Sequence, residues 1–333
     1  GRFLPDRYVE GECYICGYPD ARGDQCDHCG NLLDATKLIN PRSKNHPDER
    51  LIVRETEHYF LDLSQFTGRL LDYLDTHEPH RRPNVVRFSR NFVNEGLRGR
   101  PITRDIDWGI PVPLPGWDDK RLYVWFEAVM GYLTARIEWA RNTGQPEAWM
   151  DWWYNPEAEI YNFIGKDNIP FHTVIWPAEL MGIDGIYNGD APGLSLPYDV
   201  PANEFMNIEG KQFSKSRNWA IWLPDILERY QPDAIRYYVT VTFPETHDSD
   251  FAWDGFYNRV NGELVATWGN LVNRMLSFAW KRFDGRVPEY DTLTEADRAI
   301  IARSEEGFEE IGTLIEQVNL RDALAACMAL ARE

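Results

Sequence analysis

The chain has 333 residues, and its 53 Asp and Glu outnumber its 35 Lys and Arg, giving a formal net charge of −18. Hydrophobic residues make up 43% of the chain, enough for a sizeable core, but no apolar run is long enough to cross a bilayer. The first residues also lack the basic and apolar segments of a signal peptide, so we expect a cytoplasmic protein without membrane contact.

The first third of the chain divides into two regions by composition. Residues 1–47 are rich in Gly, Asp, Pro and Cys and show little periodicity, which predicts a small module ordered by a metal. Residues 48–100 mix a short strand-like run at 51–53 with amphipathic helical patterns at 61–74 and 85–97.

The middle of the chain alternates strand-like and helix-like segments. A linker at 100–105 and a proline-rich, extended stretch at 111–115 come first. Strands are predicted at 122–126 and 159–164, each followed by a helix, the second of them over 168–181. Such alternation predicts a parallel sheet, whose binding crevice lies beyond the carboxyl ends of the strands.

The last part of the chain is helical in pattern. Apolar residues recur at three- and four-residue spacing from 260 to 276, and 292–308 and 314–330 are typical of further helices. These segments predict a helical bundle from about residue 255 to the end.

Four of the five cysteines form two closely spaced pairs, Cys13-x2-Cys16 and Cys26-x2-Cys29. Two such pairs complete a tetrahedral Zn²⁺ site, and four thiolates close its coordination sphere. We therefore predict one structural zinc per chain, with His28 as a turn residue inside the second pair.

The segment 209–217 concentrates cations and hydroxyls behind Gly210. A mobile loop of this composition can close over a polyphosphate and stabilise developing charge, with Lys211 and Lys215 as the cations. By itself the segment is equally consistent with a solvated basic loop.

Two aromatic segments are candidates for a ligand pocket. Trp125 and Tyr132 share a helix face in one segment, and His172 and Trp176 share a face in the other. Asp167 can cap the helix that follows it, or offer a carboxylate to an ammonium group. Each feature alone is at least as common in an ordinary core.

The order of these pieces resembles methionyl-tRNA synthetases of class I, in a form similar to the archaeal branch. The resemblance rests on the four-cysteine knuckle, FIGKD followed by FHTVIWPA, the FSKS loop and GNLVNR, and it extends over essentially the whole chain. It implies activation of L-methionine by ATP with Mg²⁺ and transfer of methionine to tRNA(Met), and it implies no DNA partner.

The resemblance also places roles on residues of this chain. The methionine pocket would be formed by Trp125, Ala128, Tyr132, Asp167, His172 and Trp176. ATP would contact Gly165, Asp167, Lys211 and Lys215, and the catalytic loop would comprise Ser214, Lys215 and Ser216. The anticodon would be read by Asn270 and Arg274.

The fold implied is α/β: a partial Rossmann-like class I catalytic domain with a zinc-knuckle connective insertion and a C-terminal α-helical anticodon-binding bundle. The expected divisions are the knuckle at 1–47, the remaining insertion at 48–100, the second half of the catalytic domain at 101–204, the KMSKS-type loop and stem-contact region at 205–254, and the bundle at 255–333.

Several positions depart from the family pattern. Gln212 and Phe213 replace the first Lys and the Met of KMSKS, and Val129 stands where many members have Pro. Ser43-x2-His46 stands where the family pattern has the second half of another CxxC knuckle, so this segment offers at most one histidine ligand to a second zinc site.

The HIGH signature of the family is absent from the 333 residues, and the first residue is not Met. We expect, on these grounds, an incomplete enzyme that alone shows little pyrophosphate exchange. The alternative is a synthetase-like tRNA-binding module without catalytic activity, although keeping the pocket residues together argues against it.

Overall fold

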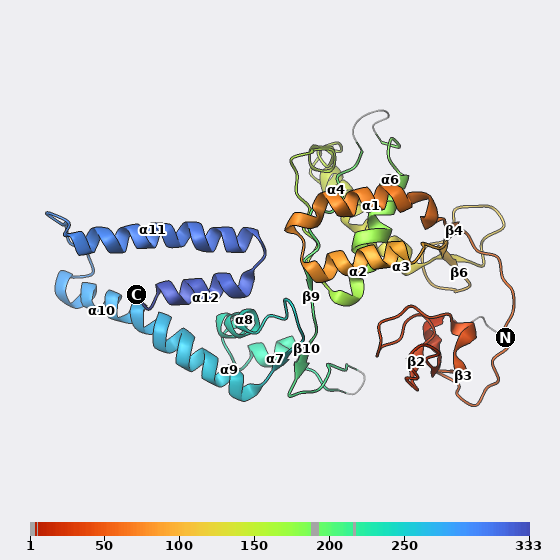
Figure 1. The fold of residues 1–333 in the computed structure, drawn as a ribbon, viewed down its shortest axis with the longest axis horizontal. Helices are drawn as coiled ribbons and strands as arrows, with labels where there is room; N and C mark the ends of the chain where they lie inside the picture. The colour runs from red at the N-terminus through yellow and green to blue at the C-terminus, as the bar shows by residue number, and fades with distance from the viewer. Residues whose placement is uncertain (1–3, 5, 188–192, 216–217) are drawn as a thin grey trace. The chain divides into compact units, whose positions relative to one another are not determined.

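The computed structural model describes residues 4, 6–187, 193–215 and 218–333, arranged as two compact units (Figure 1). Unit 1 comprises Gly1–Asn162 and Asp167–Val200, and unit 2 comprises Phe163–Lys166 and Pro201–Glu333.

Unit 1 begins with a small antiparallel sheet in the order β2-β1-β3. Its strands are β1 (Val9–Glu12), β2 (Ala21–Arg22) and β3 (Ile39–Ser43). Leu38 and Ala21 are buried here together with Cys13 and Cys26. So few apolar side chains cannot stabilise a module of this size alone, which agrees with a module ordered by a metal.

The rest of unit 1 is mainly helical, and α1 and α2 lie side by side (Figure 1). The helices are α1 (Thr67–His77), α2 (Pro83–Asn94), α3 (Val124–Glu127), α4 (Gly131–Asn142), α5 (Met150–Trp153), the π-helix η7 (Phe171–Ile175) and α6 (Trp176–Gly182). Two short antiparallel pairs accompany them, β4 (Phe60–Leu61) with β5 (Arg100–Pro101) and β6 (Thr103–Arg104) with β7 (Arg121–Leu122).

Local sequence explains where several of these helices begin and change. Pro83 occupies the first turn of α2, where its missing N–H and fixed φ are compatible with a helix start. Pro177 lies in the first turn of α6 and cannot donate to a preceding carbonyl, and the helix widens to the π form of η7 just before it. The helix predicted over 168–181 is therefore confirmed, with an irregular first half.

Two strand predictions in unit 1 are wrong. Residues 51–53 form no strand, and Ile52 and Val53 are 73% and 76% exposed, because no neighbouring segment pairs with them. The strand predicted over 122–126 ends at Leu122, where it is antiparallel to β6, and Trp125 lies in α3. A short apolar run does not distinguish a strand from a half-buried helix. The linker predicted at 100–105 instead contributes β5 and β6.

Unit 2 contains two separate parallel strand pairs rather than the single parallel sheet predicted, and of the strand predicted over 159–164 only Ile164 lies in a strand. The pairs are β8 (Ile164–Gly165) with β9 (Ala202–Asn203), and β10 (Met206–Ile208) with β11 (Ser249–Phe251). Behind the second pair, Phe251, Tyr238, Phe256 and Ile226 form a buried core.

The predicted C-terminal helices are present in unit 2, and α11 and α12 lie side by side (Figure 1). The helices of unit 2 are α7 (Leu223–Leu227), α8 (Pro232–Val241), α9 (Trp253–Arg259), the π-helix η8 (Val260–Gly269), α10 (Asn270–Phe283), α11 (Glu295–Glu316) and α12 (Leu320–Leu330). A capping box between Thr294 and Asp297 fixes the start of α11. The last helix boundary falls at 317–319, later than predicted. None of the described helices combines the length and apolar composition needed to cross a membrane.

Candidate functional site

The two cysteine pairs lie on two turns with the same hydrogen-bond pattern. Gly17 N–H donates to Cys13 O (2.8 Å), and Gly30 N–H donates to Cys26 O (2.9 Å). Both glycines have positive φ, +75° and +72°, a conformation that side chains with a Cβ rarely adopt. Each turn therefore presents the two sulfurs of its CxxC pair on one side.

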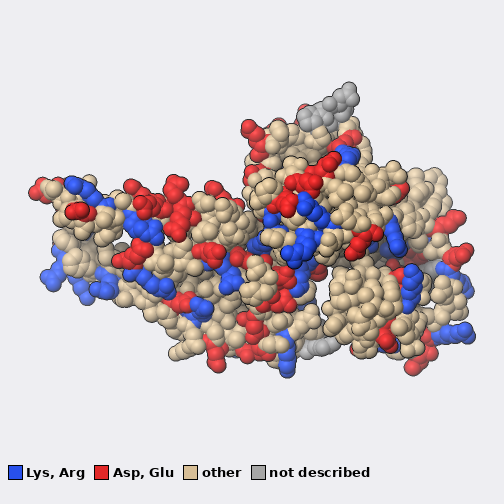
Figure 2. Space-filling model, viewed as in Figure 1, with Lys and Arg blue, Asp and Glu red and all other residues tan. Residues whose placement is uncertain are grey.

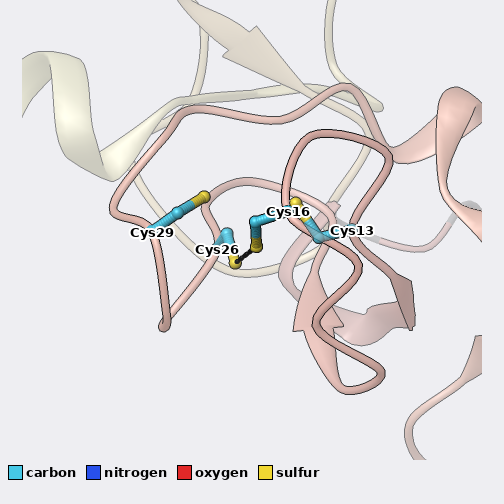
Figure 3. A group of neighbouring side chains, drawn as sticks. All are labelled: Cys13, Cys16, Cys26 and Cys29. Atoms are coloured by element: carbon cyan, nitrogen blue, oxygen red, sulfur yellow. Dashed lines mark hydrogen bonds between the residues drawn. The ribbon is translucent and has the colours of Figure 1, made fainter.

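The four sulfurs have the spacing of a tetrahedral thiolate centre. All four lie within 4.8 Å of one another, and the Sγ atoms of Cys16 and Cys26 are 3.7 Å apart (Figure 3). A tetrahedron with metal–sulfur bonds of ~2.3 Å spaces its sulfurs ~3.8 Å apart. The group can therefore hold a metal ion.

Other groups around the cysteines also suit thiolates. The Ile15 N–H donates to Cys13 Sγ (3.4 Å), and Asn31 Nδ2 donates to Cys29 Sγ (3.3 Å). Donors of this kind orient sulfur ligands around a metal. His28 stacks on Tyr18, with ring centroids 5.5 Å apart, as expected of a turn residue rather than a ligand.

Ser43 ends β3, and a bend at residues 44–45 separates it from His46. Ser43 is buried, and its Oγ accepts a hydrogen bond from the His46 N–H (3.2 Å). Among the described residues, the four cysteines of the knuckle form the one cluster of potential metal ligands found.

Three of the predicted pocket residues form a contact group in unit 1. The Tyr132 hydroxyl lies 2.8 Å from His172 Nε2, and the Tyr132 ring lies 6.3 Å from that of Trp176. Tyr132 is 44% exposed, whereas His172 and Trp176 are buried. The Tyr132 side chain is thus partly accessible to solvent, while the His172 and Trp176 rings that it contacts are buried.

The hydrogen bonds of His172 define its tautomer. Nδ1 lies 3.0 Å from the carbonyl oxygen of Asn168, which only accepts, so Nδ1 carries the proton. Burial lowers the pKa of His172, which favours the neutral ring. Nε2 is then an acceptor, and the Tyr132 hydroxyl donates to it.

This geometry predicts a pH dependence of stability. Burial depresses the pKa of His172 in the folded chain, so below the ordinary pKa of about 6.5 the unfolded chain binds a proton more readily than the folded chain does. The contribution of the neutral His172 to the free energy of unfolding is therefore complete above about 6.5, and it is lost as the pH falls towards the lower folded pKa. We expect urea unfolding of unit 1 between pH 8 and 5 to show this loss, with a slope of at most about 1.4 kcal/mol per pH unit from this residue.

The matched variant is His172→Asn, which keeps a donor near the Asn168 carbonyl and removes the titrating ring. Its stability should fall less steeply below pH 6.5 than that of the unchanged chain. Identical slopes in the two proteins would show that His172 does not titrate as described.

The remaining pocket residues lie nearby in unit 1. The Trp125 ring is 5.5 Å from that of Phe171, which directly precedes His172, and the Arg7 guanidinium lies 5.5 Å from the Trp125 centroid. Ala128 is exposed at the start of the turn before α4. Val129 is buried in the core that also contains Trp176.

Asp167 does not cap the following helix, whose N-cap is Pro170 without a side-chain hydrogen bond. Its exposed carboxylate accepts a hydrogen bond from Asn168 Nδ2 (3.3 Å) and lines a cavity of about 760 Å³ in unit 1. Trp125 and Phe171 also line this cavity, and so does Arg104. It therefore offers both aromatic surface and charges of both signs.

Sequence reasoning missed Phe171, Asn168 and Arg104. Asn168 lies four residues before His172, and in a helix this spacing places the Asn168 carbonyl oxygen near the His172 ring, so the acceptor for Nδ1 could have been predicted. Arg104, whose guanidinium stacks 3.7 Å from the Tyr123 centroid, carried no local signal.

Glu179 was also missed, although it lies one helical turn after Trp176. It is buried, neither carboxylate oxygen has a hydrogen-bond partner within the described residues, and burial raises its pKa to about 9. It is therefore protonated at neutral pH.

The basic loop lies in unit 2 as a hairpin that follows β10. Ser214 and Trp219 exchange backbone hydrogen bonds of 2.9 Å, and Lys211 Nζ lies 5.0 Å from the Trp219 ring. Lys215 is exposed between them. Ser216, the third predicted catalytic residue, lies outside the described residues.

The base of this loop is held by acidic side chains. The Gly210 N–H donates to Asp250 Oδ1 (2.8 Å), and the Trp253 N–H donates to Glu209 Oε1 (2.8 Å). Gly210 has a φ of +74°, which suits the turn that opens the loop. The loop therefore projects from a fixed base.

The other predicted residues of unit 2 are accessible or lie at a strand end. Asn270 and Arg274 are exposed one turn apart on α10. Gly165 ends β8, opposite Asn203. On the face shown in Figure 2, Lys and Arg lie among Asp and Glu rather than in one continuous basic surface.

The family model described as "tRNA synthetases class I (M)" matches residues 1–276, a range that contains every predicted site residue. This chain belongs to the methionyl-tRNA synthetase family. The family carries the class I synthetase fold, so the predicted fold class is confirmed.

Individual curated relatives support the same family assignment. The methionine–tRNA ligase of Thermomicrobium roseum is 58% identical over 332 residues, which cover 100% of this chain and 55% of the relative. The methionine–tRNA ligase of Roseiflexus sp. is 55% identical over 340 residues, which cover 100% of this chain and 56% of the relative. The chain spans about half the length of the curated relatives it matches.

A solved structure of the family is also similar. Mycobacterium tuberculosis methionyl-tRNA synthetase bound by methionyl-adenylate has a TM-score of 0.73 and 26% identity, covering 91% of this chain and 57% of that one. The free form of the same synthetase has a TM-score of 0.69 and 26% identity, and the match covers 88% of this chain and 54% of that one.

Proposed function

We propose that this chain provides the methionine pocket, the phosphate-binding loop and part of the tRNA-binding surface of a methionine–tRNA ligase. In the first step the methionine carboxylate attacks the α-phosphorus of ATP, and pyrophosphate leaves. In the second a hydroxyl of the terminal ribose of tRNA(Met) attacks the methionyl carbonyl carbon of the adenylate, an ester bond forms, and AMP leaves. Mg²⁺ bound with ATP would neutralise phosphate charge.

The observation that carries this proposal is the Tyr132–His172 hydrogen bond beside Trp176. An unbranched thioether fits against aromatic rings, and sulfur–aromatic contacts are favourable. Trp125 adds a further aromatic surface, and Asp167 offers its exposed carboxylate to the methionine ammonium group. The similar synthetase bound by methionyl-adenylate supports the same ligand.

The loop residues would act on the phosphates. Lys215 and Lys211 would stabilise the charge that develops on the α-phosphate and the leaving pyrophosphate, and the Ser214 hydroxyl would donate to a phosphate oxygen. Gly165 would allow the nucleotide to approach the backbone closely. Asn270 and Arg274 would contact anticodon bases, since amide and guanidinium groups suit unstacked base edges.

The knuckle would hold one structural Zn²⁺, which its sulfur spacing fits. With all four positions taken by thiolates, the metal would stabilise the module and take no part in the reaction.

The test is amino-acid-dependent ATP–pyrophosphate exchange by the protein as its gene encodes it. We expect exchange with methionine and a kcat/KM at least about 100-fold lower with leucine, whose branched chain does not fit the same space. Binding of tRNA(Met) without any exchange would instead support the non-catalytic tRNA-binding module.

A further inference from the structure

Lys166 lies directly after Gly165, at the carboxyl end of β8, and contacts two carboxylates. Its Nζ donates to Glu204 Oε2 (2.6 Å) and to Asp248 Oδ1 (2.8 Å). The Lys166 and Glu204 side chains are 30% and 16% exposed, so this contact is more shielded from water than a typical surface ion pair.

The two carboxylates come from segments that flank the β10–β11 pair. Glu204 joins β9 to β10, and its N–H donates to Pro244 O (2.8 Å). Asp248 directly precedes β11, and its Oδ1 also accepts from the Phe205 N–H (2.9 Å). Lys166 Nζ lies 4.3 Å from the Phe205 ring. The Lys166 ammonium group thus contacts the residues that immediately precede both strands.

The charges of this cluster depend on one another. Burial lowers the pKa of Lys166, but its hydrogen bonds to Asp248 and Glu204 outweigh that effect and raise the pKa overall. The hydrogen bond from Lys166 lowers the pKa of Asp248. Without the ammonium group, two carboxylates would face each other at close range, which is unfavourable.

The strand pair that Lys166 contacts also carries the basic loop. β10 runs directly into the Glu209–Gly210 turn, and Gly210 donates to Asp250 in β11. The loop with Lys215 projects from that turn. Lys166 therefore connects the strand end at Gly165 with the amino ends of β10 and β11, and the two short strands lead from there to the base of the loop at their carboxyl ends.

We propose that Lys166 is a positioning residue for nucleotide binding, which holds the Gly165 strand end and the base of the Lys215 loop at a fixed separation. The inference rests on the proposed function, because it assigns both elements to ATP. Two parts of a site that grip one ligand must be held at the spacing of that ligand, and small displacements lower the rate strongly.

The first experiment needs no activity. Hydrogen exchange of the 333-residue chain is compared for the unchanged protein, Lys166→Ala and Lys166→Arg. The matched control is Arg303→Ala, since Arg303 also pairs with two carboxylates, Glu310 and Glu333, within unit 2. We expect Lys166→Ala to speed exchange about tenfold in peptides covering 205–215 and 249–251. Lys166→Arg and Arg303→Ala should leave those peptides within about twofold.

The second experiment measures pyrophosphate exchange by the protein as its gene encodes it. Lys166→Ala should raise the KM for ATP and lower kcat, each about tenfold, while the KM for methionine stays within about twofold. Lys166→Arg, which keeps the charge, should recover most of both losses, and Arg303→Ala should match the unchanged protein.

The outcomes separate the two proposals. Absence of methionine-dependent exchange in the unchanged protein would contradict the proposed function, and the hydrogen-exchange result would then still decide whether Lys166 fixes the loop base. Unchanged exchange in 205–215 for Lys166→Ala would overturn the inference. So would equal rises in the KM values for ATP and methionine, or equal losses in the Ala and Arg variants.

Discussion

Replacing Lys215 by Ala should lower the rate of methionyl-adenylate formation by about 100-fold or more, with methionine affinity changed less than about twofold. The side chain is exposed on the hairpin after β10 and would contact the phosphates only as charge develops on them. Removing one preorganised donor to a developing oxyanion costs about 10²–10³ in rate. Rapid-quench measurement of adenylate, with methionine binding measured separately, gives both quantities.

The matched control for this prediction is Lys44→Ala. Lys44 is an exposed lysine in the knuckle module that pairs with Glu10 at 3.3 Å, and no role at the site is proposed for it. It should form adenylate at the unchanged rate. If Lys215→Ala also formed adenylate at the unchanged rate, the loop would have no place in the mechanism.

Replacing Cys26 by Ser should reduce the zinc content from about one per chain to nearly zero and unfold the module that contains β1, β2 and β3. The Cys26 sulfur is buried and lies 3.7 Å from that of Cys16, so Ser leaves three thiolates around the metal. Structural zinc contributes about 10–16 kcal/mol to folding in small metal-dependent modules. Elemental analysis and hydrogen exchange of residues 9–43 measure the two effects.

Cys327 provides the control, because it is the fifth cysteine and lies in α12, outside the cluster. Cys327→Ser should keep one zinc and a protected knuckle. A metal content near zero in freshly purified, unchelated wild-type protein would contradict the zinc assignment, and so would a full zinc complement in Cys26→Ser.

Sequence predictions succeeded where the interacting residues lie close together in the chain. The knuckle was predictable because each pair of ligands lies within four residues and each turn closes on its own backbone, as at Gly17 and Gly30. The helices after about residue 255 were predictable because apolar spacing is a local signal, whereas α7 and α8 were not predicted. The strand predicted over 122–126 failed because the same short apolar run fits a half-buried helix.

The contacts at the candidate site depend on residues far apart in the chain. Tyr132 and His172 are 40 residues apart, and Lys166 lies 38 and 82 residues from its two partners. The resemblance to a family selected the residues predicted for the pocket, but it did not indicate the protonated nitrogen of His172 or the two carboxylates that Lys166 contacts.

The sequence by itself determined the two cysteine pairs, the basic loop, most of the helices and, through the order of its motifs, the family. Each of these is encoded in spacing along a short segment or in the succession of segments. Only the tertiary structure decided which polar atoms meet. It showed the Tyr132 hydroxyl next to His172 Nε2, the Asp167 carboxylate exposed at a cavity rather than capping a helix, and Lys166 held between Glu204 and Asp248. The physical reason is that hydrogen bonds and burial depend on the packing of distant segments, which composition and periodicity do not specify.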